Sequence, residues 1–210
     1  MNKNLLPIAK FGLAKISYAL ILLVVFLVLD FDVLSFIAFL ITLALVYIYR
    51  NPEREVIIFD KHSVVVPCDG TVVSIEELEN EEYAYKVTIE NDFKDVGVLR
   101  APMNSKLTHI ELIRGTKISL KSTLFEKINE NATLVFEDEN NHKVKITHRM
   151  KQNFDNLSID AFSAQMFAQG SRYGFMANGV TTIYLPQNFR VNLNIGNEVQ
   201  ASQTLVGYFS

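Results

Sequence analysis

The stretch Val64-Val-Val-Pro-Cys-Asp-Gly-Thr-Val-Val-Ser-Ile75 sets the fold class of this chain. Three valines end at Pro67, the pair Asp69-Gly70 is typical of a tight turn, and a second run of β-branched residues begins at Thr71. Such side chains lose rotamer freedom in a helix and pack well on a pleated sheet. The stretch therefore predicts two short strands joined by a turn.

Similar runs recur through the rest of the chain and predict a mainly β body. Asn140-Asn141 lies between two of them and indicates a hairpin. The further predicted strands are Tyr85–Ile89, Val96–Leu99, Leu107–Leu112, Ala132–Phe136, Lys143–His148, Gly179–Leu185 and Phe189–Leu193.

One stretch has helical spacing, and one is a run of charge. Over Ser158–Gln169 the apolar residues Ile159, Phe162, Met166 and Phe167 share one helical face, and Gly170 follows as a C-cap, so a short helix is predicted there. Five glutamates between Glu76 and Glu82 predict a solvated loop.

The two ends of the β body carry matching turn signals. The segment Val66–Val73 and the segment Ile195–Val206 each contain a glycine-marked turn, as in a barrel-sandwich unit whose ends meet. Biotinyl and lipoyl carrier domains have similar ends but need a lysine at an exposed hairpin tip, and the chain has no such tip. The expected fold is a predominantly β, barrel-sandwich-like body with one or two short helices.

The first fifty residues have a different composition. Ile16–Leu29 and Val33–Tyr49 are almost wholly apolar over 14 and 17 residues. The second run reaches the lower limit of about 17 residues for a spanning helix, whereas the first is short unless Lys10 and Lys15 snorkel. Lysines precede the first run, Arg50 follows the second, and only Asp30 and Asp32 lie between them. The positive-inside rule then places both ends in the cytoplasm. We expect a two-helix membrane hairpin over 1–50 and a β domain over 51–210 facing the cytoplasm; the alternative is a buried helical hairpin of a soluble protein.

Composition excludes several functional classes. The chain has 210 residues, 49% of them hydrophobic, and one cysteine, which excludes a disordered tail and a disulfide-stapled secreted module. The net charge of −3 divides into +2 over residues 1–50 (four basic, two acidic) and −5 over 51–210 (16 basic, 21 acidic). An acidic body is not built to bind nucleic acid.

Read together, six motifs in order resemble the phosphatidylserine decarboxylase family in its short, membrane-anchored form. They cover nearly the whole chain, and the order and spacing carry the resemblance because each motif alone is weak. The motifs are Arg50-Asn-Pro-Glu-Arg-Glu55, Val66-Pro-Cys-Asp-Gly-Thr-Val-Val73 (Pro-Ala-Asp-Gly in the family), Asp95-Val-Gly-Val-Leu-Arg-Ala-Pro102 (Asp-Val-His-x-x-Arg-x-Pro), Asn129-Glu130-Asn131 (Asn-Glu-Arg), Gly170-Ser-Arg-Tyr-Gly174 (Arg-Phe-Gly) through Tyr184-Leu-Pro186, and a Gly-x-x-Val-x-Ala-x-x-Thr-Leu ending.

The resemblance implies decarboxylation of phosphatidylserine to phosphatidylethanolamine. The family's electron sink is a pyruvoyl group, made when a Gly-Ser bond rearranges through an ester and breaks, and its ketone forms a Schiff base with the substrate amine. An Asp-His pair assists the serine, as in a hydrolase triad. Carried over, the aspartate is Asp69, the histidine position is Gly97 and the serine position is Val180, or Gly179 if the spacing differs by one.

Two of these three positions depart from the family. Gly97 has no side chain to act as a base, and neither Val180 nor Gly179 has a hydroxyl or thiol, so no pyruvoyl group can form at Gly179-Val180 and no other cofactor is predicted. Thr181, which would give a ketobutyryl group, and Ser171 in Gly170-Ser171-Arg172 are alternative hydroxyls, and His109 is an alternative base. Asp69 then serves only its turn.

The remaining reactive residues have simpler interpretations. Cys68 is expected to be a small buried residue in place of alanine, and His62, His142 and His148 lack ligand spacing, so no metal site is predicted. The leading hypothesis is an inner-membrane, catalytically inactive relative of phosphatidylserine decarboxylase, linked to phospholipid biosynthesis, with phosphatidylserine as a candidate ligand and a homodimer as a possible assembly. The competing hypotheses are a working decarboxylase that uses another hydroxyl and a membrane-tethered protein-binding scaffold.

Overall fold

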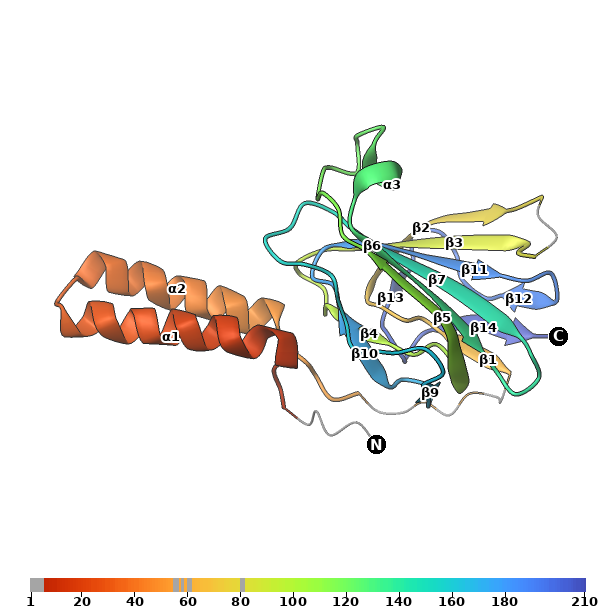
Figure 1. The fold of residues 1–210 in the computed structure, drawn as a ribbon, viewed down its shortest axis with the longest axis horizontal. Coiled ribbons are helices and arrows are strands. Elements are labelled where there is room, and N and C mark those ends of the chain that lie inside the picture. The colour runs from red at the N-terminus through yellow and green to blue at the C-terminus, as the bar shows by residue number, and fades with distance from the viewer. Residues whose placement is uncertain (1–5, 55–56, 58, 60–61, 80–81) are drawn as a thin grey trace. The chain divides into compact units, whose positions relative to one another are not determined.

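The computed structural model describes residues 6–54, 57, 59, 62–79 and 82–210. The chain divides into two compact units, 1–53 and 54–210. Helices and strands follow in the order η1 Lys10–Gly12, α1 Leu13–Val28, α2 Asp32–Ile48, β1 Ser63–Val65, β2 Gly70–Glu77, β3 Tyr85–Asn91, β4 Val98–Arg100, β5 Ser105–Ile113, α3 Phe125–Ile128, β6 Asn131–Glu137, β7 Lys143–Met150, β8 Ser158–Ile159, β9 Met166–Phe167, β10 Arg172–Phe175, β11 Gly179–Leu185, β12 Phe189–Val191, β13 Glu198–Val199 and β14 Leu205–Phe209 (Figure 1).

The first unit is a pair of antiparallel helices. The segments outside the helices meet, because Ala9 N–H donates to Tyr49 at 2.7 Å and Asn51 N–H donates to Pro7 at 2.7 Å. A side chain at Gly12 would collide with the Tyr49 ring, since a Cβ there would lie 2.2 Å from Cγ. The glycine therefore lets Tyr49 pack against the start of α1.

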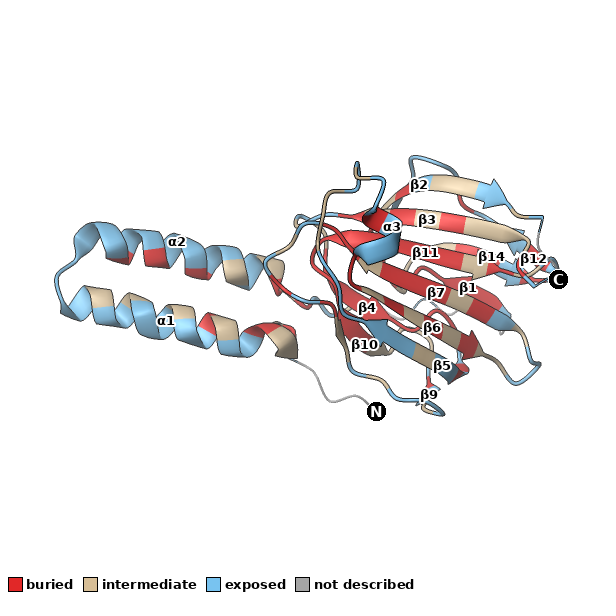
Figure 2. Ribbon diagram, turned by 45° about the horizontal axis from the view of Figure 1, so that its top comes forward, coloured by how far each residue is buried: buried red, intermediate tan, exposed pale blue. Residues whose placement is uncertain are grey.

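The second unit is a β body with a single apolar core. Its largest sheet has eight strands in the order β13-β2-β3-β11-β7-β6-β5-β9, and two three-stranded sheets have the orders β1-β14-β12 and β4-β10-β8. Buried residues from all three sheets form one cluster, for example Val64, Leu99 and Ile183. Burial is concentrated in the middle strands of the large sheet (Figure 2). The predicted predominantly β fold with an N-terminal helix pair is confirmed.

The two glycine-marked ends of the β body meet, as their motifs indicate. Val64 pairs with Gly207 in the β1–β14 ladder, and Gly70 pairs with Val199 between β2 and β13. Val66 N–H also donates to Thr204 at 2.9 Å. The hairpin predicted at Asn140-Asn141 connects β6 to β7.

The helix predicted over Ser158–Gln169 is wrong. Its ends are two short strands: β8 pairs with β10 and β9 pairs with β5. Ala164 between them has a φ of 69°, which breaks a helix, and Phe162 and Met166 are each 67% exposed rather than on a buried face. A helix of three turns is marginal alone, so pairing with existing strands overrides its periodicity.

One smaller expectation also needs correction, and one short helix lies where the sequence analysis assigned no element. The glutamate run begins inside β2, which extends to Glu77, so only its later part lies outside a strand; residues 80–81 lie outside the described ones. The short helix α3 replaces no predicted element and follows the loop after β5.

Candidate functional site

Asp69 is held by an ion pair and by the backbone of the C-terminal segment. Both of its carboxylate oxygens accept hydrogen bonds from the Arg54 guanidinium, at 2.7 and 2.5 Å. Ala201 N–H donates to the same carboxylate at 2.8 Å, and Arg54 donates to the Ala201 carbonyl. The side chains of Arg54 and Asp69 are only 8% and 11% exposed. The carboxylate therefore fastens the start of the β body to its end, and the expectation that Asp69 serves only its own turn is wrong.

Gly97 lies where there is no room for a side chain. A Cβ at this residue would lie 2.9 Å from two atoms of the Phe175 ring and 3.0 Å from the Met176 carbonyl oxygen. Phe175 is fully buried, and Met176 N–H donates to the Gly97 carbonyl at 2.7 Å. A histidine here would require the β4–β10 ladder or the Phe175 ring to move.

Gly179 and Val180 begin β11, at the centre of the large sheet. Val180 pairs with Glu90 on β3 and Arg149 on β7, and it is 7% exposed. A Cβ on Gly179 would lie 2.5 Å from the Met176 sulfur. Met176 therefore lies beside both Gly97 and Gly179, so these two predicted site positions are close together in the fold.

Asp69 is connected to Val180 through the sheet rather than by side-chain contact. Thr71, two residues beyond Asp69, pairs with Glu90, which in turn pairs with Val180. The three positions Asp69, Gly97 and Val180, hereafter the family set, thus lie in one region of the fold. Residue 97 in this set has no imidazole, and residue 180 has no hydroxyl.

The next residue on β11, Thr181, joins a different group of side chains. Successive residues of a strand face opposite sides, so Thr181 faces the core and is fully buried. Its Oγ1 lies 2.8 Å from Nδ1 of His148, and Nε2 of His148 lies 2.6 Å from the Tyr173 hydroxyl. Either neutral tautomer of the imidazole satisfies both bonds, with one nitrogen donating and the other accepting.

Burial keeps this group uncharged. Desolvation lowers the pKa of His148 to about 3 and raises the pKa of Tyr173 well above its ordinary value. Cys68 is 1% exposed and shares a hydrogen bond with the Thr181 side chain, and desolvation raises the pKa of the Cys68 thiol to about 12. Cys68, His148, Tyr173 and Thr181, hereafter the buried polar cluster, form a neutral chain of hydrogen-bonding groups.

The sequence contains a signal for His148 that spacing rules overlook. On β7 the residues Val144, Ile146, His148 and Met150 alternate and are all buried. A histidine on the apolar face of an alternating strand must find hydrogen-bond partners inside the core. Two members of the buried polar cluster, Cys68 and Tyr173, stand where the resembled motifs have alanine and phenylalanine.

The candidate base His109 and the candidate hydroxyl Ser171 both lie on elements other than β11, which carries Val180. His109 is exposed on β5, three strands from β11 in the sheet order β11-β7-β6-β5, so it is not adjacent to Val180. Ser171 lies in the turn before β10, where its carbonyl accepts from Ala101 N–H at 2.8 Å and its N–H donates to Ala168 at 3.0 Å.

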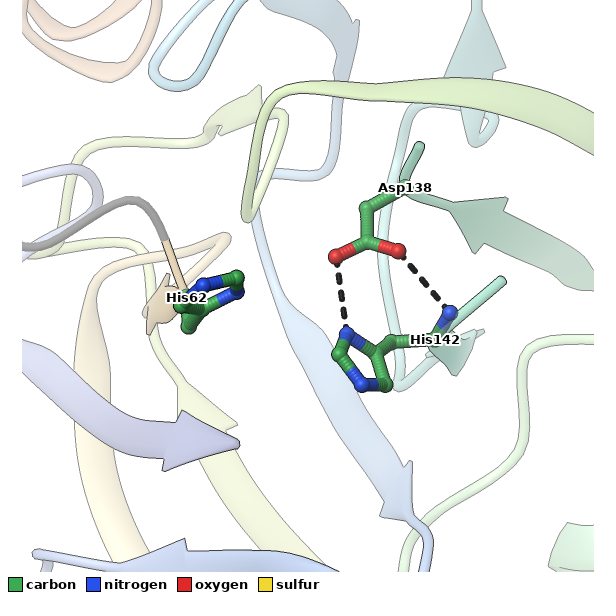
Figure 3. Close-up of side chains that lie close together, drawn as sticks. All are labelled: His62, Asp138 and His142. Atoms are coloured by element: carbon green, nitrogen blue, oxygen red, sulfur yellow. Dashed lines mark hydrogen bonds and ion pairs between the residues drawn. The ribbon is translucent and has the colours of Figure 1, made fainter. Parts of the chain in front are cut away.

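Two histidines that are far apart in the sequence meet at one end of the β body. His62 precedes β1, and His142 follows the β6–β7 turn. One ring nitrogen of each histidine and one carboxylate oxygen of Asp138 all lie within 4.8 Å of one another (Figure 3). His62 and His142 lack ligand spacing along the chain, which is why no metal site is predicted, yet they lie close together in space. The cause is the fold, which places the entry to β1 beside this hairpin.

Comparisons with known proteins agree on one family. The family model described as Phosphatidylserine decarboxylase matches residues 41–207. A Phosphatidylserine decarboxylase proenzyme of Desulfotalea psychrophila is 26% identical over 206 residues, covering 96% of each chain. A protein with the same description from Geobacter metallireducens is 28% identical, and the match covers 99% of each chain. Another from Geobacter sp. (strain M21) is 30% identical, and the match covers 93% of this chain and 91% of the relative.

Proposed function

Because this chain belongs to the phosphatidylserine decarboxylase family, with a role in phospholipid biosynthesis, we propose that it is a membrane-anchored member that does not process itself at Gly179-Val180 and is catalytically inactive. The family makes its pyruvoyl group from its own chain, so no external cofactor is involved. The proposal therefore depends on whether this chain can make that group at the family set.

The observation that carries the proposal is the chemistry of the family set. An ester intermediate needs a hydroxyl, and Val180 has none. A base at residue 97 would need space that Phe175 and Met176 fill. Both carboxylate oxygens of Asp69, the remaining member, accept from Arg54, and one of them also accepts from Ala201 N–H. The residues present do not fit a pyruvoyl group at this position.

Membrane anchoring is supported by the inverted surface of the helix pair. The buried residues of α2 are Ser35, Ala38 and Thr42, one face of small side chains, and α1 buries Ile16. Most of the large apolar residues of both helices are exposed. Small residues between helices with apolar side chains outside are typical of helices that pack in lipid.

The lengths of the helices are compatible with this proposal. Among the described residues, Lys10–Val28 is the one helix long and apolar enough to cross a membrane, and Asp32–Ile48 is apolar but shorter. With basic residues before α1 and after α2 and two aspartates between them, the β body would face the cytoplasm. A carbonate wash of membranes tests the anchor: retention of the full chain is expected, and its release would contradict anchoring.

Intact mass tests the absence of processing. The full chain, purified in detergent, is expected to give one species of 23.9 kDa and to release no CO₂ from phosphatidylserine vesicles. A protein cut between Gly179 and Val180, or measurable CO₂ release, would overturn the proposal. Binding to vesicles with and without phosphatidylserine then separates a retained headgroup pocket from a scaffold without lipid specificity.

One observation favours a second candidate function, an active enzyme that processes itself at Val180-Thr181. Thr181 Oγ1 lies 2.8 Å from a neutral imidazole nitrogen of His148, the pairing of nucleophile and base that activates a hydroxyl. Attack on the Val180 carbonyl would move the acyl group from nitrogen to oxygen. Elimination would free the Val180 carboxylate, and one water would convert the remaining dehydro residue to a 2-oxobutyryl group and ammonia.

The same mass measurement distinguishes this second function. Fragments 1–180 and 181–210 would support it, and they should disappear in Thr181→Val and His148→Gln but persist in His109→Ala, which removes a histidine outside the buried polar cluster. An uncut chain contradicts it.

A further inference from the structure

Apart from the family set and the buried polar cluster, the residues His62, Asp138 and His142 form a cluster of metal-ligand type at one end of the β body (Figure 3). Asp138 Oδ2 accepts a hydrogen bond from Nδ1 of His142 at 2.9 Å. The other carboxylate oxygen accepts from the backbone N–H groups of Asn140 and His142, each at 2.8 Å. Asp138 therefore caps the turn and fixes the orientation of the histidine that follows it.

Phe209 contacts both histidines. The His142 ring stacks on Phe209, with centroids 4.2 Å apart and planes inclined by 8°. Phe209 N–H donates to the His62 carbonyl at 3.1 Å, and the two imidazole centroids lie 6.0 Å apart. Phe209 of β14 thus fixes the His142 ring and the backbone of His62, and it holds the two residues beside each other.

We propose that His62, Asp138 and His142 bind a divalent transition-metal ion of the Zn²⁺ type. Two imidazoles and one carboxylate are a donor set that suits Zn²⁺, Ni²⁺ or Cu²⁺, whereas Mg²⁺ and Ca²⁺ require mainly oxygen ligands. Tetrahedral zinc with ligand distances of about 2.0 Å puts ligand atoms roughly 3.3 Å apart. The spread of up to 4.8 Å therefore has to contract, and the exposed His62 ring is free to turn inward.

The site also opens on a cavity, which leaves room for a fourth ligand. A cavity of about 510 Å³ is lined by His62 and Asp138 together with Lys106, Glu137, Glu139 and Met166. A water in the fourth position would lie on this side. The bound ion would link the segment before β1 to the β6–β7 hairpin, and this inference is independent of whether the chain processes itself.

Metal titration of the full chain in detergent tests the proposal. The protein, with its affinity tag removed, is treated with EDTA, dialysed and titrated with ZnCl₂ by calorimetry. One Zn²⁺ per chain is expected, with affinity weakened at least tenfold in His62→Ala and in His142→Ala and unchanged in His109→Ala, which removes an exposed histidine elsewhere. MgCl₂ should give no heat of binding.

Two results would overturn the proposal: no Zn²⁺ binding by the unmodified chain, or binding that His62→Ala leaves unchanged. A measurement on the unmodified chain avoids dependence on the folding of the variants. Co²⁺ added to it should give the intense visible absorption of a tetrahedral ion, and the weak spectrum of the hydrated ion would also refute the site. Neither result bears on the family or on the mass of the chain.

Discussion

The family set and the buried polar cluster are one residue apart at two places in the chain, and their chemistry is opposite. Asp69 adjoins Cys68, and Val180 adjoins Thr181. In the family set, Asp69 is held in an ion pair, Gly97 is packed against Phe175, and Val180 has no hydroxyl or thiol of its own. In the buried polar cluster, hydroxyl, imidazole and phenol form a continuous chain of hydrogen bonds.

This difference follows from the alternation of side chains along a strand. Val180 and Thr181 face opposite sides of β11, so changes on one side leave the packing of the other intact. Asp69 of the family set makes the contacts that join the two ends of the β body. In the buried polar cluster, Thr181 supplies a hydroxyl and His148 a base next to Val180. Four predictions test whether the first group is structural and the second is a satisfied neutral network.

The largest expected effect is the loss of the Asp69 ion pair. Asp69→Ala would leave Arg54 nearly buried without its carboxylate, and removing one member of a buried pair costs about 3–5 kcal/mol. Urea unfolding measures this loss. The matched control is Glu76→Ala, whose pair with Lys86 is exposed and should change the free energy by less than about 1 kcal/mol. Equal losses in both variants would contradict a structural role for Asp69.

Acid should destabilise the β body through His148. Its folded pKa of about 3 lies below the unfolded value of about 6.5, so the unfolded state binds the extra proton between these values. Stability should fall by about 1.4 kcal/mol per pH unit as the pH drops below about 6. Since carboxylates also titrate at low pH, the measured quantity is the difference between the unmodified chain and His148→Gln. Parallel pH profiles would show that His148 is not buried as a neutral base.

The next effect concerns the space at Gly97. Gly97→His must displace Phe175 or Met176, and overpacking of a core costs about 1–3 kcal/mol. Thermal unfolding measures the loss, and Val73→His, at a residue 43% exposed on β2, serves as the control with an expected change within about 0.5 kcal/mol. The double variant Gly97→His, Val180→Ser should remain uncut by intact mass. Cleavage in that variant would show that the position accepts a working histidine.

The smallest effect concerns the end of the buried polar cluster. Tyr173→Phe restores the residue of the resembled motif but leaves Nε2 of His148 unpaired, at a cost of about 1–2 kcal/mol. Tyr208→Phe, at a tyrosine 42% exposed, is the control and should be nearly neutral. A Tyr173→Phe protein as stable as the unmodified chain would show that His148 finds another partner.

Local pattern predicts much of the fold and fails where long-range pairing decides. The strand Gly179–Leu185 begins and ends where the sequence predicts, because its β-branched residues lie between a glycine and a proline. The stretch Ser158–Gln169 has helical spacing, yet β10 and β5 pair with its two ends. The residues of that stretch do not indicate that strands β10 and β5, which are distant in the chain, have edges open for pairing with it.

By itself, the sequence determined the β body, the apolar helix pair, the family and the residues at positions 97 and 180. These properties follow from residue type, local order and the chemistry that each side chain can or cannot perform. Only the tertiary structure decided which side chains meet. Phe175 closes on Gly97, His148 reaches Thr181 and Tyr173, and His62 approaches His142. Each meeting depends on strand register and packing between segments that are distant in the chain, and residue spacing along the chain carries no such information.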